Sequence, residues 1–435
     1  MSDEVNLTRI RERLAARVVS ATRIRDDRIA EALREVPRHL FLPQLPPESA
    51  YRDDAIVTKR DADGQPISSS SQPAIMAIML DQLALAPGLR VLEIGAGTGY
   101  NAALMKHIVG PAGTVVSVDI DADVAGQARD HLVSAGYPDV TVVAADGAEG
   151  YPPAAPYDRV IATVGVSDLA PPWLAQTEPG GRIVVPFDVR GTQLAVAFER
   201  ASDGPWISVS LVPCGFMRMR GSLAGPERAV SLQPGLSVML PDGLTLADGK
   251  DVDAEALAAY LAGPPVQLPT GVRTGSEQVV WGLGLWLAAG DPRSCTVAEE
   301  RPARARGSGA GRPGEPGAFR LVRAPVRSRG LRLTAGIVDS GGFAVLTTAP
   351  VASQGSAAGQ APGLLTLEVT GYGPHAAELA AGLVAHVQAW DQAGQPGAGG
   401  LHVDAYPRSS GAGPAPAHDG LLIERPSMRF VVYHA

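Results

Sequence analysis

The fold is decided by one stretch of the chain, Val91-Leu92-Glu93-Ile94-Gly95-Ala96-Gly97-Thr98-Gly99. Its first four residues are apolar and branched enough for a buried parallel strand. Three alternating glycines follow, and glycine lets the backbone turn sharply against a ligand. The dinucleotide-binding pattern places its third glycine three positions after the second, whereas Gly99 follows Gly97 by two. The stretch therefore predicts a strand and a ligand-binding turn of another kind.

Acidic residues accompany the ends of three successive predicted strands. Glu93 lies just before the glycine turn, Asp119 ends the apolar run 114–118, and Asp146 with Gly147 follows the run 140–145. A carboxylate at such a strand end can accept hydrogen bonds from ribose hydroxyls. The series resembles the class I S-adenosylmethionine methyltransferases, which have a Rossmann-like α/β fold. A glycine-rich turn that binds nothing is the alternative, and the three acids together count against it.

The resemblance implies which residues meet S-adenosyl-L-methionine. Glu93 and the turn backbone are expected to face its methionine and ribose portions, Asp119 the ribose hydroxyls, and Asp146 the adenine amino group. Thr163, at the end of the fourth strand, either lines the cleft or only packs. The expected cofactor-binding residues are Glu93, Gly95, Ala96, Gly97, Thr98, Gly99, Asp119, Ile120, Asp146, Gly147 and Thr163.

A second motif precedes the glycine turn and reads Gly64-Gln65-Pro66-Ile67-Ser68-Ser69-Ser70-Ser71-Gln72-Pro73. With residues 36–43 and 179–186, it resembles the protein-L-isoaspartate O-methyltransferases, whose acceptor-side serine immediately precedes Gln-Pro. Ser71 is the expected catalytic counterpart and Ser70 the second choice, each able to hold one carboxylate oxygen while the other faces the methyl group. The alternative is a helix-capping serine loop before Pro73.

Two departures from that family pattern suggest a specialised variant. The motif carries extra serines and follows a charged segment, 57–63, and about two hundred further residues come after the cofactor domain. These features resemble the variant found beside biosynthetic genes for ribosomally made peptides (graspetides, lanthipeptides and FxLD-type systems). That resemblance implies methylation of an aspartate carboxylate in a cyclised precursor peptide, followed by closure to an aspartimide. General isoaspartate repair is the alternative, and a cofactor-binding but silent partner protein is the third hypothesis.

Composition limits the remaining possibilities. A chain of 435 residues, 45% of them hydrophobic, can bury the cores of two domains. A net charge of −8 argues against a general nucleic-acid surface. Cys214 and Cys295 have no metal-ligand spacing and suit buried positions in a reduced compartment. Because no apolar run is long enough for a signal core or membrane span, we expect a cytoplasmic protein without membrane contact. The sequence does not indicate an oligomeric state.

Apolar periodicity predicts a methyltransferase domain over residues 1–222, with a helical cap over 1–60 and a Rossmann-like core over 61–222. Residues 223–435 are expected to form an α+β accessory domain. Residues 44–67 read as an exposed loop with a short strand, and residues 301–317 as a loop. In the core, strands are predicted at 90–94, 114–118, 140–145, 158–163, 182–186, 193–199 and 206–214, and helices at 99–109, 122–135 and 168–177. In the accessory domain, a helix is predicted at 375–393 and strands at 331–337, 343–347, 364–369, 401–406 and 429–433.

Overall fold

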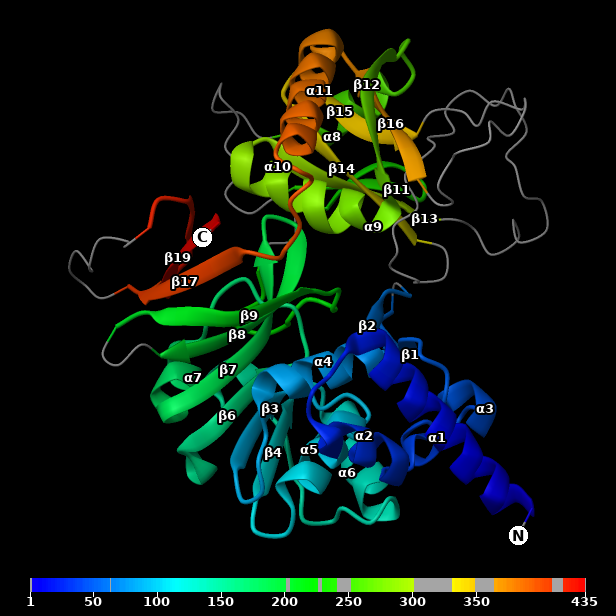
Figure 1. The fold of residues 1–435 in the computed structure, drawn as a ribbon, viewed down its shortest axis with the longest axis vertical. Helices are drawn as coiled ribbons and strands as arrows, with labels where there is room; N and C mark the ends of the chain where they lie inside the picture. Colours follow the sequence, from blue (N-terminus) through cyan, green and yellow to red (C-terminus); the bar gives the residue numbers. More distant parts are fainter. Residues whose placement is uncertain are drawn as a thin grey trace. The chain divides into compact units, whose positions relative to one another are not determined.

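The chain forms two units, drawn as a ribbon in Figure 1. The computed structural model describes residues 2–62, 64–200, 204–225, 229–240, 252–300, 331–348, 364–408 and 418–434. The first unit comprises Met1–Asp188, Gln193–Gly225 and His402–Tyr433, and the second comprises Val189–Thr192, Pro226–Leu401 and His434–Ala435. The predicted loop at 301–317 lies outside the described residues.

A ten-stranded sheet organises the first unit, in the order β18-β19-β17-β9-β8-β7-β6-β3-β4-β5. Its parallel part consists of β3 (Arg90–Ile94), β4 (Thr114–Asp119), β5 (Thr141–Ala144), β6 (Tyr157–Ala162) and β7 (Thr177–Val189). Ile94 pairs with Val118 on one side and Ala162 on the other, so the carboxyl ends of these strands share one edge. This arrangement confirms the Rossmann-like α/β fold.

The helical cap packs through buried apolar residues of its two long helices. Helices α1 (Ser2–Thr22) and α2 (Asp27–Glu35) contact α4 (Pro73–Leu83), and α2 also contacts α5 (Tyr100–Val109). Leu14, Val18, Ile29 and Leu33 are fully buried in the same apolar core as α4 and α5. The other helical segments of this unit are η1 (Arg38–Phe41), α3 (Pro47–Ala50), α6 (Ala122–Ser134), η2 (Gly147–Glu149), η3 (Pro152–Ala154) and α7 (Pro171–Gln176).

The predicted exposed loop at 44–67 is more ordered than its polar composition suggests. It contains α3 and most of an antiparallel hairpin made of β1 (Ile56–Arg60) and β2 (Pro66–Ser70). Tyr51 is buried, and its hydroxyl lies 2.8 Å from His39 Nδ1. The second strand of the hairpin leads directly to Ser71 and the start of α4.

The last strands of the chain belong to the first sheet. Strand β17 (Leu401–Pro407) pairs antiparallel with β9 (Trp206–Pro213), which pairs with β8 (Thr192–Arg200). Strands β18 (Leu421–Glu424) and β19 (Met428–His434) continue the sheet. The ring centroids of Phe430 in β19 and Phe187 in β7 are 4.3 Å apart. A single boundary between residues 222 and 223 therefore does not describe the chain, because strand pairing over such a sequence separation leaves no local signal.

The second unit is built on a seven-stranded sheet in the order β10-β11-β13-β14-β15-β16-β12. Alternate residues of β15 enter different cores: Ala344 and Leu346 pack under α11 (Ala376–Gln392), whereas Phe343 and Val345 join the core that includes Leu257 of α8 (Ala254–Tyr260). The other strands are β10 (Ala229–Gln233), β11 (Leu236–Met239), β12 (Val266–Gly275), β13 (Ser294–Glu300), β14 (Leu331–Asp339), β15 (Gly342–Thr348) and β16 (Leu364–Tyr372). Helical segments α9 (Ser276–Gln278), η4 (Val279–Leu283, π-helical) and α10 (Gly284–Gly290) precede β13.

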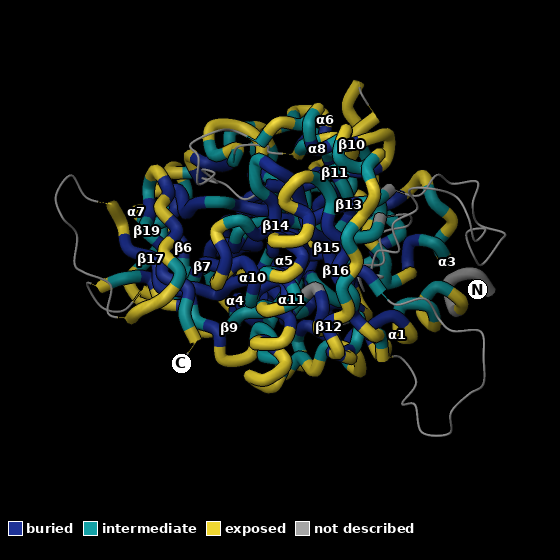
Figure 2. The backbone as a smooth tube through the Cα atoms, turned by 90° about the horizontal axis from the view of Figure 1, so that it is seen from above, coloured by how far each residue is buried: buried dark blue, intermediate teal, exposed yellow. Residues whose placement is uncertain are grey.

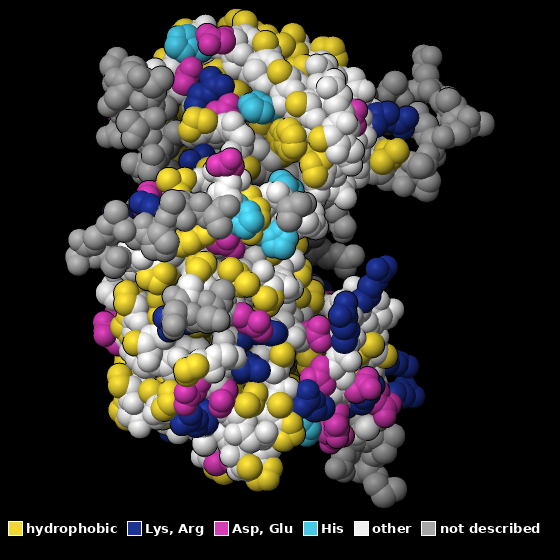
Figure 3. Space-filling view, turned by 60° about the vertical axis from the view of Figure 1, so that its left-hand side comes forward, with side chains coloured by type: hydrophobic (Ala, Val, Ile, Leu, Met, Phe, Trp, Pro, Cys, Tyr) yellow, Lys and Arg dark blue, Asp and Glu magenta, His cyan; other side chains and the backbone are white. Residues whose placement is uncertain are grey.

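Central strands of the two sheets are deeply buried: four of five residues in β3 and six of seven in β15 are buried, and Figure 2 colours the backbone by burial. The predicted α+β character of the second unit is confirmed. Cys214 and Cys295 are buried and form no disulfide, and burial raises the pKa of both thiols. On the face drawn in Figure 3, basic and acidic side chains are intermixed. Within the described ranges, no helix is long and apolar enough to cross a membrane.

Candidate active site

The glycine turn lies directly after β3 at the carboxyl edge of the parallel strands. Gly95, Gly97 and Gly99 all have positive φ, at 101°, 53° and 87°, and Gly99 caps the start of α5. A Cβ on Gly95 would lie 2.6 Å from Thr163 Oγ1, and one on Gly97 would lie 3.1 Å from the Ser69 carbonyl oxygen. These positions need glycine for both conformation and space. Ala96 and Thr98, between them, are buried.

Glu93 supports this turn from behind. Its side chain is 0% exposed, Asn101 Nδ2 donates to Oε1 at 2.8 Å, and Ser117 Oγ donates to Oε2. Burial raises the pKa of Glu93 to about 7. Both carboxylate oxygens of Glu93 are thus held by side chains of the protein, and a contact between Glu93 and the cofactor stays a prediction.

Asp119 ties the next strand end to the turn. Its Oδ2 accepts a hydrogen bond from the Gly97 amide at 3.1 Å, and its Oδ1 accepts one from the Asp121 amide at 3.0 Å. Burial raises the pKa of this carboxyl group. Ile120, next to it, is 40% exposed.

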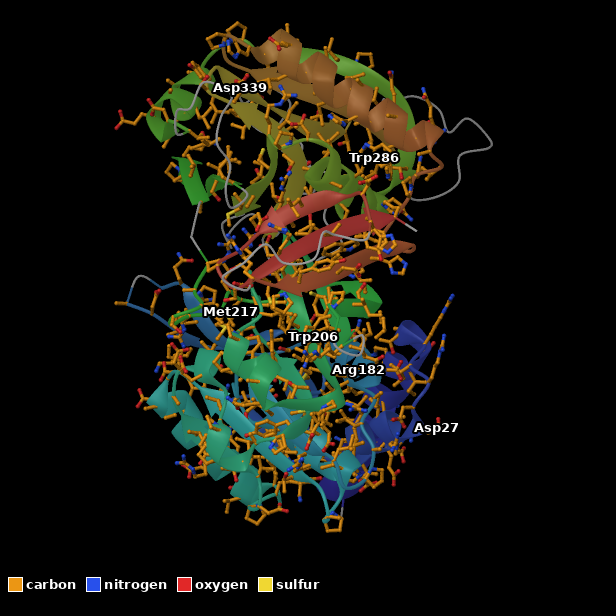
Figure 4. The ribbon with its side chains drawn as sticks, turned by 90° about the vertical axis from the view of Figure 1, so that its left-hand side faces the viewer. Asp27, Arg182, Trp206, Met217, Trp286 and Asp339 are labelled. Carbon is orange, nitrogen blue, oxygen red and sulfur yellow. The ribbon has the colours of Figure 1, made fainter. Side chains whose placement is uncertain are left out.

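Asp146 accepts a hydrogen bond from residue Ser222, which lies in a segment without any recognised motif. Its Oδ1 accepts from the Ala148 amide at 3.0 Å and its Oδ2 from the Ser222 amide at 2.8 Å, and these bonds hold its pKa below the usual value. The segment before Ser222 is fixed at Gly165, whose amide donates to the Met217 carbonyl at 2.7 Å (Met217 is labelled in Figure 4). The glycine-rich composition of residues 215–225 is the only signal in the sequence for this connection.

Two further residues predicted to bind the cofactor, Thr163 and Gly147, contact the protein around the glycine turn. Thr163 Oγ1 donates to the Gly95 carbonyl at 2.7 Å, so its hydroxyl fixes the turn from the neighbouring strand. Gly147 is buried, and a Cβ there would lie 2.5 Å from Ile94 Cγ2. The structure thus places Thr163, Gly147 and the glycine turn at one edge, as the parallel register requires.

The serine segment lies against the same turn. The Ser69 carbonyl oxygen is the nearest atom to the open side of Gly97, since it would lie 3.1 Å from a Cβ at that position. Ser70 is buried, at 3% exposure, and its hydroxyl has no hydrogen-bond partner among the described residues. Ser71 is half-buried and its carbonyl accepts from Arg38 Nη2 at 3.0 Å. The two motifs found in the sequence therefore meet in space.

This combination defines a class of protein. A parallel sheet with a glycine turn after one strand and an acidic residue after the next is typical of Rossmann-like enzymes that bind a nucleoside cofactor at the carboxyl edge. A family model described as protein-L-isoaspartate(D-aspartate) O-methyltransferase (PCMT) matches residues 10–223. The protein-L-isoaspartate O-methyltransferase of Methanopyrus kandleri is 41% identical over 203 residues, covering 46% of this chain and 87% of the relative. The chain belongs to the protein-L-isoaspartate O-methyltransferase family.

Other comparisons give the extent of the likeness. The enzyme of the same name from Hyperthermus butylicus is 37% identical over 233 residues, covering 52% of this chain and 94% of the relative. A solved protein-L-isoaspartate O-methyltransferase aligns with 91% of this chain and 96% of its own, at 22% identity and a TM-score of 0.48. A Plasmodium falciparum structure in complex with S-adenosyl-L-homocysteine aligns with 48% of this chain and 97% of its own, at 15% identity and a TM-score of 0.42.

S-adenosyl-L-methionine is the cofactor of this methyltransferase family, and the residues at the edge fit it. The glycines form a turn packed so tightly against its neighbours that no side chain fits there, Asp119 lies beside the turn, and exposed Ile120 offers an apolar surface. Among the described residues, no group of three or more His, Cys, Asp or Glu side chains is arranged to hold a metal ion.

Proposed function

We propose that this chain methylates the carboxylate of an isoaspartyl residue in peptides and proteins, with Ser70 and Ser71 holding the acceptor. The observation that carries this proposal is the buried Ser70 hydroxyl, which has no hydrogen-bond partner in the described part of the chain and follows Ser69, the residue that contacts Gly97. A buried hydroxyl without a partner is costly, and an acceptor carboxylate oxygen would satisfy it. The names of the relatives support this general isoaspartyl function.

The methyl transfer requires no strong general acid or base from the chain. A carboxylate is ionised at neutral pH, with an ordinary pKa near ~4, so its oxygen needs no general base. The cofactor, when bound, supplies an electrophilic methyl group on its sulfonium sulfur. Once that methyl group is transferred, the remainder of the cofactor is a neutral thioether. The serine hydroxyls donate to one carboxylate oxygen and thereby orient the other toward the methyl group. Such positioning of two reactants can lower the activation free energy by up to roughly 7–11 kcal/mol in well-oriented systems. The methyl ester then loses methanol as the next backbone nitrogen attacks, closing a succinimide.

Maturation of a ribosomal precursor peptide is the second candidate function. In this case the acceptor is an ordinary aspartate in a cyclised precursor, and the product is an aspartimide or isoaspartate. The observation that favours it is the main segment of the second unit, Pro226–Leu401, which lies outside the residues matched by the family model. The precursor peptide is then the partner that this unit would help to bind.

Mass spectrometry of two substrates separates the candidates. Wild type and Ser71→Ala are incubated with S-adenosylmethionine and either a generic isoaspartyl peptide or a cyclised precursor encoded beside the gene. Methylation of the generic peptide by wild type, weakened in Ser71→Ala, is the expected result. Methylation of the precursor alone, followed by loss of methanol to a species one water lighter than the starting peptide, would replace it with maturation. Cofactor binding without turnover of either substrate would contradict both.

A further inference from the structure

Arg38 is a buried cation that holds the serine segment. Its side chain is 0% exposed, and no carboxylate of the described residues lies within ion-pair distance of it. Its Nε donates to the Ala50 carbonyl at 2.9 Å and its Nη2 donates to the Ser71 carbonyl at 3.0 Å. Burying a charge is costly unless the surroundings compensate it. Packing alone therefore gives no reason for an arginine at this position.

The same arginine also contacts the helix that begins at the glycine turn. Its guanidinium carbon lies 4.9 Å from the centroid of the Tyr100 ring, and Tyr100 is the first residue of α5. A cation over an aromatic face is stabilised by the ring quadrupole, and more so when both are desolvated. Arg38 thus joins the acceptor-side serine to the first helical residue after Gly99.

Asp53 holds the next residues of the segment. Its Oδ1 accepts from the Ala74 amide at 2.9 Å, and its Oδ2 accepts from Gln72 Nε2 at 3.1 Å. Helix α4 needs this contact because its N-cap residue, Gln72, makes no side-chain cap bond of its own. An acceptor at a helix N-terminus satisfies an amide that otherwise has no partner. Asp53 supplies that acceptor from a distant part of the sequence.

We infer that Arg38 and Asp53 are positioning residues of the acceptor site: they hold the main chain around Ser71, Gln72 and Ala74 so that the serine hydroxyls can meet the acceptor carboxylate. These four hydrogen bonds go to main-chain atoms or to the Gln72 amide, and none of the four goes to a serine hydroxyl. The inference rests on the proposed function, since it assumes that these hydroxyls bind the acceptor.

Kinetics with four variants and two matched controls test the inference. Asp53→Ala and Arg38→Met are expected to lower kcat/KM for an isoaspartyl peptide about tenfold or more, because small misplacements cost large factors in rate. Cofactor Kd, measured by calorimetry, is expected to stay within about twofold, since neither residue touches the glycine turn. Asp53→Asn keeps an oxygen for Ala74 and can pair with a flipped Gln72 amide, so it should recover most of the activity. Arg38→Lys cannot reach both carbonyls and should not.

The controls are Asp54→Asn and Arg34→Met, which change the same charges nearby. Asp54 pairs with Arg52 at 3.3 Å, and Arg34 is an exposed residue of α2. Both controls should keep wild-type kcat/KM. Wild-type kcat/KM in Asp53→Ala and Arg38→Met, or an equal loss of cofactor affinity, would overturn the inference.

Hydrogen exchange gives a second measurement that does not depend on turnover. Exchange over residues 68–77 should quicken in Asp53→Ala, which frees the Ala74 amide, and stay unchanged in Asp53→Asn and Asp54→Asn. Unchanged exchange in Asp53→Ala would overturn the positioning role. Faster exchange together with a wild type that methylates no isoaspartyl peptide would instead show that the proposed function has failed while the structural contact stands.

Discussion

Lys59 Nζ lies 2.7 Å from Asp121 Oδ2, and this ion pair ties the β1–β2 hairpin to the start of α6. Asp121 in turn donates its amide to Asp119, the acidic residue beside the glycine turn. The hairpin therefore contacts the cofactor edge twice, through Lys59 on β1 and through the Ser69 carbonyl on β2.

Loss of this ion pair should loosen the hairpin. In Lys59→Met, hydrogen exchange over residues 56–70 is expected to quicken, whereas exchange in α6 stays slow because Asp121 still caps that helix. A partly exposed ion pair is screened by salt, so about 1 M salt should produce part of the same effect in wild type. Equal exchange in Lys59→Met and wild type at low salt would show that the pair does not anchor the hairpin.

Removal of the Ser70 hydroxyl should lower the rate of methyl transfer without lowering the stability of the fold. Because this buried hydroxyl has no partner among the described residues, Ser70→Ala is expected to leave Tm unchanged or slightly higher. Methyl transfer to an isoaspartyl peptide should fall, with cofactor Kd unchanged. A scan of Tm beside steady-state kinetics measures both, and a lower Tm with normal kcat/KM would assign Ser70 a structural role only.

Removal of the Ser71 hydroxyl should likewise reduce methyl transfer while leaving cofactor binding nearly intact. The Arg38 bond goes to the Ser71 carbonyl, so Ser71→Ala keeps the main-chain contact. Single-turnover kinetics with saturating cofactor measure the effect on the methyl-transfer step. Unchanged single-turnover rates would remove Ser71 from the site.

Glu93 should make the free energy of unfolding fall as pH rises, which is opposite to the usual effect of a carboxyl group. Its pKa of about 7 in the folded protein exceeds the unfolded value of 4.5, so its favourable contribution is fully present below pH 4.5 and is lost as pH rises through about 7. A difference of this size is worth about 3 kcal/mol. Glu93→Gln can keep the bonds to Asn101 and Ser117 without this dependence. Relative to wild type, the variant should gain stability between pH 5 and pH 8 in denaturant titrations, and equal slopes would contradict the assignment.

Space at Gly95 should prove necessary for cofactor binding. Gly95→Ala puts a Cβ 2.6 Å from Thr163 Oγ1 and forces the turn to shift, so cofactor Kd is expected to rise more than about tenfold. Gly88→Ala is the matched control, because Gly88 also has positive φ but has nothing within 4 Å of its Cβ position. That variant should lose about 1 kcal/mol of stability and keep cofactor affinity. Calorimetric titration of both variants makes the comparison.

The local part of the fold could be predicted because short apolar runs and glycines act within a few residues. Strands β3 to β6 and helices α5, α6 and α11 lie within a few residues of their predicted bounds. Strand β12 was not predicted, since it contains Pro269 and a register shift between Pro269 and Arg273. Strand β13 was also not predicted, and the pairing of β17 with β9 depends on residues almost two hundred positions apart.

The site was predictable where motif spacing determines geometry. The strand register brings Gly95, Asp119 and Asp146 to one edge, as the sequence indicated. The burial of Glu93 and the Ser222 bond to Asp146 were not predictable, because they depend on what packs behind or beside each carboxylate. Arg38 lies in residues 36–43, which contribute to the family resemblance, but the contacts of Arg38 and Asp53 with residues 71–74 were not predictable, because they form only in the folded chain.

The return of residues 401–434 to the first sheet makes the second unit an insertion rather than a tail. Truncation after residue 225 would remove β17, β18 and β19 and leave the edge of β9 unpaired. An unpaired edge is prone to aggregation, so loss of activity in such a fragment would say nothing about peptide binding. Excision of residues 226–400 with a short linker before Leu401 keeps all ten strands. The second unit therefore interrupts the sequence of the first, and an internal deletion, not a truncation, is the variant in which its contribution to peptide binding can be measured.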